Sequence, residues 1–202
     1  MEWNYEFDVV VVGSGNGALT AALCSHDGGA KTLVIEKSSQ FGGTSATSGG
    51  GVWIPNNRYA KAENVDDSDQ DARNYINSVS PEGMIKDELI ETYISEGPRM
   101  IDYLHENSQV KYRNLAHYPD YFPDNIGGKE GNRSIEPEPI FGTELGDDLG
   151  KLREQHPQTA FTMGPINMNF TQVEGQLLLG ALPGWKTQFA KLFTKYILDF
   201  AM

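Results

Sequence analysis

The run from Asp8 to Glu36 constrains the fold more than any other stretch of this sequence. Four valines at 9–12 predict a strand of the kind buried on both faces of a parallel sheet, and glycines follow at once. Gly13, Gly15 and Ala18 match the small positions of the G-x-G-x-x-G/A pattern that turns a strand into a helix around a pyrophosphate. We expect a side chain at Gly13 to obstruct the turn and one at Gly15 to keep a phosphate from the backbone. The first N–H groups of the following helix then face an anion.

A helix and a second strand complete a βαβ unit. The predicted helix ends near Gly28–Gly29, a pair typical of a C-cap. Lys31–Ile35 predict the second strand, and Glu36 follows it, about twenty residues past the turn, where such units carry a ribose-hydroxyl acceptor. The alternative is a glycine-bearing loop of another α/β protein, but the order of strand, turn, helix, strand and acid favours a dinucleotide-binding unit.

A second glycine-rich segment follows the βαβ unit at Gly42–Ser45 and Ser48–Gly51. Residues without bulk, interleaved with hydroxyls, let the backbone approach a large planar or phosphorylated ligand. A simple NAD domain has little use for such a segment, whereas FAD is longer and more deeply buried. We therefore predict FAD as the cofactor. The predicted cofactor-binding residues are Gly13, Ser14, Gly15, Asn16, Gly17, Ala18, Glu36, Lys37, Gly42, Gly43, Thr44, Ser45, Ser48, Gly49, Gly50 and Gly51.

Residues 36–57, EKSSQFGGTSATSGGGVWIPNN, resemble the flavin-binding segment of the fumarate reductase and succinate dehydrogenase flavoprotein superfamily, and are most similar to 3-ketosteroid 1-dehydrogenases. Tyr118–Tyr121, Gly131–Pro137 and Lys195–Asp199 extend the resemblance. In the succinate dehydrogenase branch a histidine attaches the flavin covalently, and Thr44 stands at the equivalent place here. The resemblance therefore implies FAD bound without a covalent link.

The resemblance also implies a reaction, the 1,2-dehydrogenation of 3-ketosteroids, in which a base removes a proton and the neighbouring carbon gives a hydride to flavin N5. A tyrosine base has an ordinary pKa of about 10, which a hydrogen bond to its phenolate would lower. Tyr121 aligns with the family tyrosine that assists catalysis, so we predict it as this helper. The principal tyrosine base and the rest of the flavin domain are expected beyond Met202, and the electron acceptor is not indicated.

The predicted fold is α/β: a Rossmann-like FAD-binding domain, incomplete in this chain, followed by the mainly helical start of a substrate domain. Residues 1–57 are assigned to the former and 58–202 to the latter. Further expectations are a helix beginning near Asp66–Asp69, another at Ser80–Pro81, a break or kink at Gly97–Pro98, a strand at Val110–Leu115, a loop at Ala116–Pro139, a short charged helix at Leu145–Glu154, a loop at 156–169 and a capping box at Thr171–Glu174.

Composition excludes several classes of function. A net charge of -12 argues against nucleic-acid binding, because phosphates would repel the chain. The single cysteine, Cys24, allows no internal disulfide and suits a reducing compartment, and the histidines show no metal-like spacing. With no signal peptide and no apolar run long enough to span a bilayer, we predict a cytoplasmic protein.

Two apolar features leave alternatives open. Tyr118, Tyr121 and Phe122 line a pocket for a large apolar ligand, or they pack beneath their own loop. The 185–200 helix packs against the rest of the protein, or it rests on the inner face of a membrane as a peripheral contact. Its apolar face comprises Trp185, Phe189, Leu192, Phe193, Tyr196, Ile197 and Phe200.

Two other functions compete with a steroid dehydrogenase. One is a related flavoprotein that acts on another enone or on a small dicarboxylate, which would call for arginine and histidine clamps. The other is a non-catalytic FAD-binding remnant, which a flavin absorption spectrum would separate from an enzyme.

Overall fold

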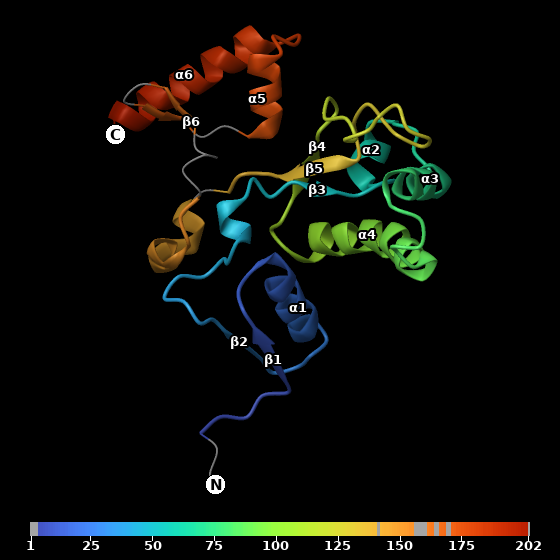
Figure 1. The fold of residues 1–202 in the computed structure, drawn as a ribbon. Helices are drawn as coiled ribbons and strands as arrows, with labels where there is room; N and C mark the ends of the chain where they lie inside the picture. The colour runs from blue at the N-terminus through green and yellow to red at the C-terminus, as the bar shows by residue number, and fades with distance from the viewer. Residues whose placement is uncertain (1–3, 141, 156–160, 164–165, 169–170, 202) are drawn as a thin grey trace. The chain divides into compact units, whose positions relative to one another are not determined.

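The computed structural model describes residues 4–140, 142–155, 161–163, 166–168 and 171–201. These residues form two compact units, Met1–Gly50 with Ile140–Asn169 and Gly51–Pro139 with Phe170–Met202 (Figure 1). The predicted division at residue 57 concerns the roles of the two parts, and it stays a prediction.

The first unit contains the predicted βαβ arrangement. Strands β1 (Val9–Val12) and β2 (Thr32–Ile35) pair in parallel, with Val9 opposite Thr32 and Val12 opposite Ile35. Helix α1 (Asn16–Asp27) connects them and ends at Gly28, as expected (Figure 1). The expectation that the valines are buried on both faces is wrong for the described residues, since Val12 is 78% exposed and only Val11 is buried. The described sheet has two strands, so little covers the sides away from α1.

The remaining elements of the first unit are short. The 3-10 turns η1 (Ser45–Thr47) and η2 (Gly142–Lys151) and the hairpin strands β6 (Phe161–Met163) and β7 (Ile166–Met168) complete it. The short charged helix expected at 145–154 is present as the 3-10 structure η2, which begins and ends three residues earlier and is interrupted by the non-helical backbone of Gly146. Part of the loop expected at 156–169 forms the hairpin, and the rest lies outside the described residues.

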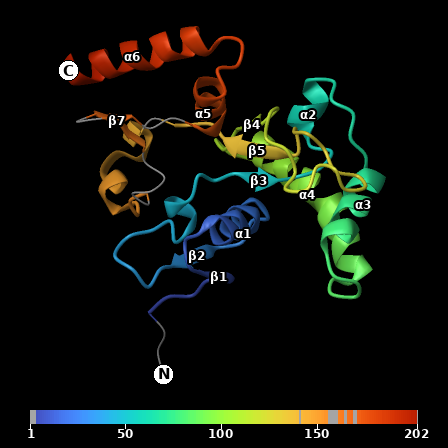
Figure 2. The same cartoon turned by 45° about the horizontal axis from the view of Figure 1, so that its top comes forward.

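The second unit is built on an antiparallel sheet in the order β3–β5–β4, whose strands are β3 (Val52–Trp53), β4 (Tyr112–Asn114) and β5 (Ser134–Pro137). Figures 1 and 2 show α4 (Asp87–Asn107) along one side of this sheet. Ile54, Ile101 and Ile135 form the core between them. The strand expected at 110–115 is confirmed as β4, but the loop expected at 116–139 also contains the central strand β5.

Helix α2 (Arg58–Ala62) packs against β4, and α3 (Asp69–Val79) packs on α4. Ser68 caps α3 by accepting the N–H of Asp71, which confirms the predicted start. The helix expected at Ser80–Pro81 is wrong: Gly83, with φ +71°, belongs to a turn, and α4 begins at Asp87. Of the break or kink expected at Gly97–Pro98, the break is absent, because α4 passes through both residues, and the kink stays a prediction.

Gly97 has a packing role in α4. It is buried, and a Cβ there would lie 3.4 Å from the Ile54 side chain. A proline inside a helix costs one backbone hydrogen bond. The helix nevertheless continues past Pro98. Before the proline, Ile94 packs in a cluster with Ala72 of α3, and after it Ile101 packs with Ile54 in the core against the sheet.

Helix α5 (Gln172–Leu179) is joined to the sheet by a buried glutamate. Glu136 of β5 accepts the N–H of Val173 in the first turn of α5 at 3.0 Å, while its neighbour Ile135 lies in the core. The capping box predicted at Thr171 and Glu174 is confirmed. Helix α6 (Trp185–Ala201) follows, close to its predicted bounds.

Candidate functional site

The turn between β1 and α1 is shaped by a backbone that only glycine adopts easily. Gly13 has φ +99°, and its N–H donates to the carbonyl of Ile35 at 2.7 Å, which fastens the turn to β2. A Cβ at Gly13 would meet no atom within 4 Å, so conformation and not space is the reason for glycine, contrary to our expectation of an obstruction. Gly15 then stands at the N-cap of α1, as the motif predicts.

Ser14 links the turn to both segments expected to hold the cofactor. Its buried hydroxyl donates to Glu36 at 2.5 Å and accepts the N–H of Gly42 at 2.9 Å. The other oxygen of Glu36 accepts the N–H of Ser38 at 3.0 Å. Ser14, predicted as a cofactor contact, therefore also has a structural role that the sequence pattern did not reveal.

These hydrogen bonds keep Glu36 ionised. The bond from the Ser14 hydroxyl, followed by that from the Ser38 N–H, lowers the pKa of Glu36 below its ordinary value. A carboxylate accepts several hydrogen bonds at once, so Glu36 can still receive hydroxyl donors. It lies just past the end of β2, where a ribose would be recognised.

The two glycine-rich segments lie side by side. A Cβ on Gly43, whose φ is +55°, would lie 3.5 Å from the backbone of Gly15. A Cβ on Gly15 would in turn lie 3.4 Å from the Ser45 hydroxyl, which accepts the N–H of Asn16 at 3.0 Å. The result is a wall of backbone at the N-terminus of α1, where helix geometry leaves N–H groups without helical partners.

This wall fits the phosphates and ribose of a dinucleotide, because it combines close backbone, N–H donors and a carboxylate acceptor. The structure brings together the predicted residues 13–16, 36 and 42–45. Thr44, Ser48 and Gly49 are exposed nearby in sequence, and Lys37 and Gly17 are exposed beside the site. Gly51 belongs to the second compact unit.

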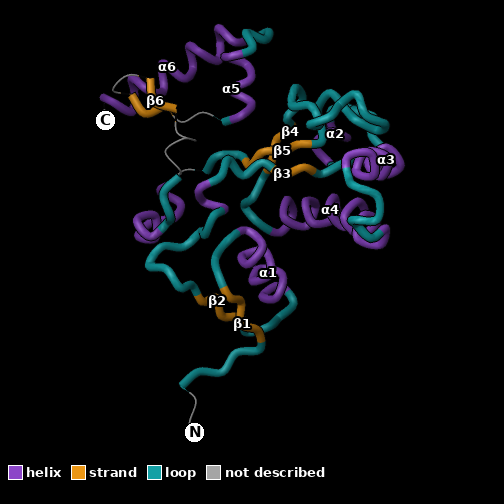
Figure 3. The backbone as a smooth tube through the Cα atoms, viewed as in Figure 1, coloured by secondary structure: helices purple, strands orange, loops and turns teal. Residues whose placement is uncertain are grey.

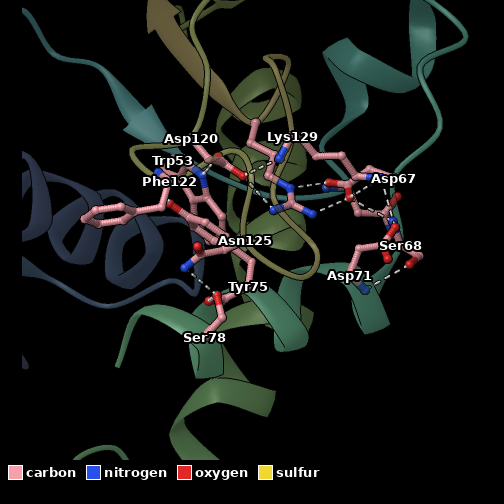
Figure 4. A network of polar contacts seen from close by, with 12 residues as sticks. Trp53, Asp67, Ser68, Asp71, Tyr75, Ser78, Asp120, Phe122, Asn125 and Lys129 are labelled. Carbon is pink, nitrogen blue, oxygen red and sulfur yellow. Dashed lines mark hydrogen bonds and ion pairs between the residues drawn. The ribbon is translucent and has the colours of Figure 1, made fainter. Parts of the chain in front are cut away.

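The predicted helper tyrosine lies between β4 and β5 in the second unit. Figure 3 draws most of this connection as loop. Tyr121 is 83% exposed, whereas Asp120 directly before it is buried. Phe122 is also exposed, and Figure 4 shows its ring directed away from the polar network around Asp120. Of the two alternatives for these aromatics, packing beneath their own loop is therefore wrong for Tyr121 and Phe122.

A buried ion network supports this loop, and the sequence analysis missed it (Figure 4). The guanidinium of Arg133, which is 1% exposed, donates two hydrogen bonds to Asp67 at 2.7 and 3.0 Å and one to Asp120 at 2.8 Å. Asp120 also accepts the indole N–H of Trp53 at 2.6 Å. The acidic run at 66–69 was interpreted only as a helix start, although Asp120 and Arg133 both lie in motifs that carried the family resemblance.

Charge pairing outweighs burial in this network. Burial alone raises the pKa of Asp67, but the hydrogen bonds from Arg133 and from the N–H of Asn56 bring it below the ordinary value. Burial likewise acts to lower the pKa of Arg133, and the two carboxylates raise it overall. Asp67 and Arg133 are therefore both charged at neutral pH.

The described part of the chain lacks two kinds of feature. It contains no group of three or more His, Cys, Asp or Glu residues placed to hold a metal ion. Nor does it contain a helix with the length and apolar character needed to cross a membrane.

Comparison with known proteins gives three close relationships. The chain is 38% identical to 3-oxosteroid 1-dehydrogenase of Mycolicibacterium smegmatis over 83% of its length. It is 38% identical to 4-oxocyclohexanecarboxylate 2-dehydrogenase of Sinomonas cyclohexanicum over 78%. The solved 3-ketosteroid delta1-dehydrogenase of Sterolibacterium denitrificans, in complex with 1,4-androstadiene-3,17-dione, matches 96% of the chain with a TM-score of 0.85 and 38% identity.

The chain spans 29% and 27% of the two curated relatives and 33% of the solved one. The FAD binding domain model matches residues 8–183, which include both glycine-rich segments, Glu36 and the Tyr121 loop. The predicted cofactor class and the α/β flavoprotein fold are thereby confirmed. By this match, the chain belongs to the FAD binding domain family.

Proposed function

We propose that this chain forms the N-terminal portion of an FAD-dependent 3-ketosteroid 1-dehydrogenase, an oxidoreductase that acts on CH–CH bonds. The identity to 3-oxosteroid 1-dehydrogenases over most of the chain carries this proposal, and the backbone wall at Gly13–Ser45 supports it. Residues 1–57 belong to the FAD-binding domain, and residues 58–202 lead into the substrate domain.

FAD is held without a covalent link. The N–H groups at the start of α1 bind its pyrophosphate, and Glu36 accepts hydrogen bonds from its ribose. Gly15 and Gly43 let the backbone approach, and Thr44 offers no imidazole for attachment. When bound, the flavin supplies the acceptor for the substrate hydride.

Tyr121 acts as a helper to the proton-abstracting tyrosine. Its exposed hydroxyl donates a hydrogen bond to the phenolate of that base and so lowers the pKa of the base. Its exposed neighbours Phe122 and Ile126 present apolar surface on the same loop, which suits a hydrophobic substrate such as a steroid.

A dicarboxylate substrate is disfavoured by the charges of the loop. Such a substrate needs free arginine clamps. Lys129 pairs with Asp71 at 2.9 Å, and Arg133 is taken by Asp67 and Asp120. A small cyclic ketone remains the alternative, because one relative is named for 4-oxocyclohexanecarboxylate.

The test uses protein expressed from the complete open reading frame that contains this chain. We expect visible flavin absorbance, release of the flavin on denaturation, and faster dehydrogenation of a 3-ketosteroid than of 4-oxocyclohexanecarboxylate with an artificial dye as electron acceptor. Tyr121→Phe should slow turnover and leave the flavin content unchanged. A colourless protein would favour a non-catalytic remnant, and preference for the cyclohexane substrate would reassign the enzyme.

Cofactor contacts are tested separately. Glu36→Ala should weaken FAD retention, and Glu6→Ala, an exposed charge change in the same unit, is its matched control. Equal retention in both variants would contradict the ribose role of Glu36.

We also propose a cytoplasmic protein whose α6 contacts the inner face of a membrane. Phe189 and Phe193 stack on each other with 45% and 49% of their surfaces exposed, while Leu192 is buried. The side chains of Tyr196 and Phe200 lie outside the described residues. Co-sedimentation with anionic phospholipid vesicles that is lost in Phe189→Asp would support this contact, and no co-sedimentation would favour packing within the protein. The electron acceptor stays open.

A further inference from the structure

The loop that carries Tyr121 is closed on itself by the residue next to it. The N–H of Asp120 donates to the carbonyl of Lys129 at 2.9 Å, and the N–H of Lys129 donates back to the Asp120 carboxylate at 3.0 Å. Residues 120–129 therefore form a loop whose two ends are joined by main-chain and side-chain bonds.

Arg133 fastens this closed loop to the body of the unit. Its guanidinium bridges Asp120 at one end of the loop and Asp67 ahead of α3. It also lies 5.5 Å from the ring centre of Trp53 and 5.7 Å from that of Tyr75. A planar guanidinium held by two carboxylates and two aromatic rings has little freedom to move.

The far side of the loop lies directly on α3. A Cβ at Gly127 would lie 2.1 Å from the carbonyl oxygen of Asp71, so backbone packs against backbone there. The hydroxyl of Tyr75 accepts the N–H of Phe122 at 3.3 Å. Both residues that flank Tyr121 in the chain are thus hydrogen-bonded to buried groups.

The Tyr121 side chain is in the opposite situation. It is 83% exposed, and within the described residues no hydrogen bond, ion pair or ring contact holds it. A fixed backbone with a free polar side chain presents a functional group in one direction, as reactions that depend on orientation require.

We propose that Arg133 is a positioning residue for Tyr121: by clamping Asp120 it fixes the backbone from which the Tyr121 hydroxyl reaches the reacting groups. This inference rests on the proposed function. Arg133 itself touches neither substrate nor cofactor in this scheme, and it acts through the loop.

The kinetic test is a double-mutant cycle in the flavin-loaded, full-length protein. Arg133→Lys keeps the charge but cannot hold both carboxylates in a fork, so we expect kcat to fall about tenfold to a hundredfold with flavin content unchanged. Tyr75→Phe removes only the acceptor for the N–H of Phe122, so it should lower kcat by a smaller factor. It replaces Arg133→Lys as the test variant if that protein does not fold. Arg99→Lys, in an exposed pair with Glu96, is the matched control and should leave kcat unchanged.

The decisive comparison is made in the Tyr121→Phe background. Once the hydroxyl is gone, positioning it has no value, so Arg133→Lys should lower kcat no further. An equal loss in both backgrounds overturns the positioning role, because it indicates general damage. If Tyr121→Phe alone leaves kcat unchanged, the proposed function of Tyr121 fails instead, and the inference fails with it.

Amide hydrogen exchange gives a readout that needs no turnover. Residues 120–129 should exchange faster in Arg133→Lys than in the unaltered protein, while the amides of α1 should be unaffected. Unchanged exchange in the loop would overturn the proposal even if activity fell.

Discussion

Replacing Arg133 with methionine tests how much the buried ion network contributes to stability. The substitution keeps an unbranched side chain of similar length but removes three hydrogen bonds to two buried carboxylates. Asp67 keeps the N–H groups of Asn56 and Ser68, and Asp120 keeps those of Trp53 and Lys129. Both carboxylates then remain buried without the guanidinium between them, and Asp67 keeps only the more distant ammonium of Lys129, at 4.0 Å, as a balancing charge.

Removal of one partner from a buried ion pair costs about 3–5 kcal/mol. The N–H donors that remain still stabilise the carboxylates in part. We therefore expect a loss of unfolding free energy near the lower end of this range, about 3 kcal/mol at pH 7. Because whole domains are stable by only about 5–15 kcal/mol, such a loss is easily measured.

The dependence on pH identifies the cause. The folded-state pKa of Asp67 is lowered, so its stabilising effect is present above the unfolded pKa and is lost as pH falls through the folded value. Without Arg133, burial is opposed by fewer groups, so the pKa of this carboxyl is higher than in the unaltered protein, and protonation then relieves the buried charge. The difference in stability between the two proteins should therefore shrink below about pH 4.

The assay is urea unfolding followed by the fluorescence of Trp53, in a background where the other two of the three tryptophans are phenylalanine. Arg99→Met is the matched control: its pair with Glu96 is exposed, so we expect a change below about 0.5 kcal/mol. The reasoning would be refuted if Arg133→Met lost less than about 1 kcal/mol of unfolding free energy at pH 7. It would also be refuted if the loss at pH 3.5 were as large as the loss at pH 7.

Three further outcomes follow from described contacts. Gly127→Ala should lower the urea midpoint, because φ is +77° and the new Cβ would lie 2.1 Å from the Asp71 carbonyl oxygen; an unchanged midpoint would contradict the close approach. Thr171→Ala should destabilise α5 by about 1 kcal/mol through loss of the capping box, measured as faster amide exchange confined to α5. Ser14→Ala should raise the pKa of Glu36, so that in FAD titrations the variant releases FAD at a higher pH than the unaltered protein as the solution is acidified.

The βαβ unit could be predicted because its signals are local. The valine run, the glycine turn and the acid after β2 are all determined by neighbours in sequence, and β1, α1 and β2 appear within a residue or so of their expected bounds. The helix caps could be predicted for the same reason, since Ser68 and Thr171 bond to residues only three positions away.

The β4–β5 region could not be predicted in the same way. Strand β5 pairs with β3, whose residues lie far away in the sequence. Glu136 and Pro137 of β5 are also residue types that are more typical of loops than of a central strand. The ion pair of Arg133 with Asp67 likewise joins positions 66 residues apart, and no periodicity marks such a pair. Charged residues are usually exposed, so their burial here had no signature in composition.

Strand β5 carries an apolar side chain, Ile135, followed directly by a charged one, Glu136. Ile135 lies in the core, whereas Glu136 bonds to the first turn of α5. Because side chains alternate across a strand, a slip of one position would place the Glu136 carboxylate where Ile135 now sits and leave the first turn of α5 without its acceptor. The wrong alignment would thus cost free energy at two places. It would bury a carboxylate in the hydrophobic core, and it would remove the hydrogen bond that holds the first turn of α5. The same two neighbouring side chains, Ile135 and Glu136, therefore specify both the register of β5 and the docking of α5.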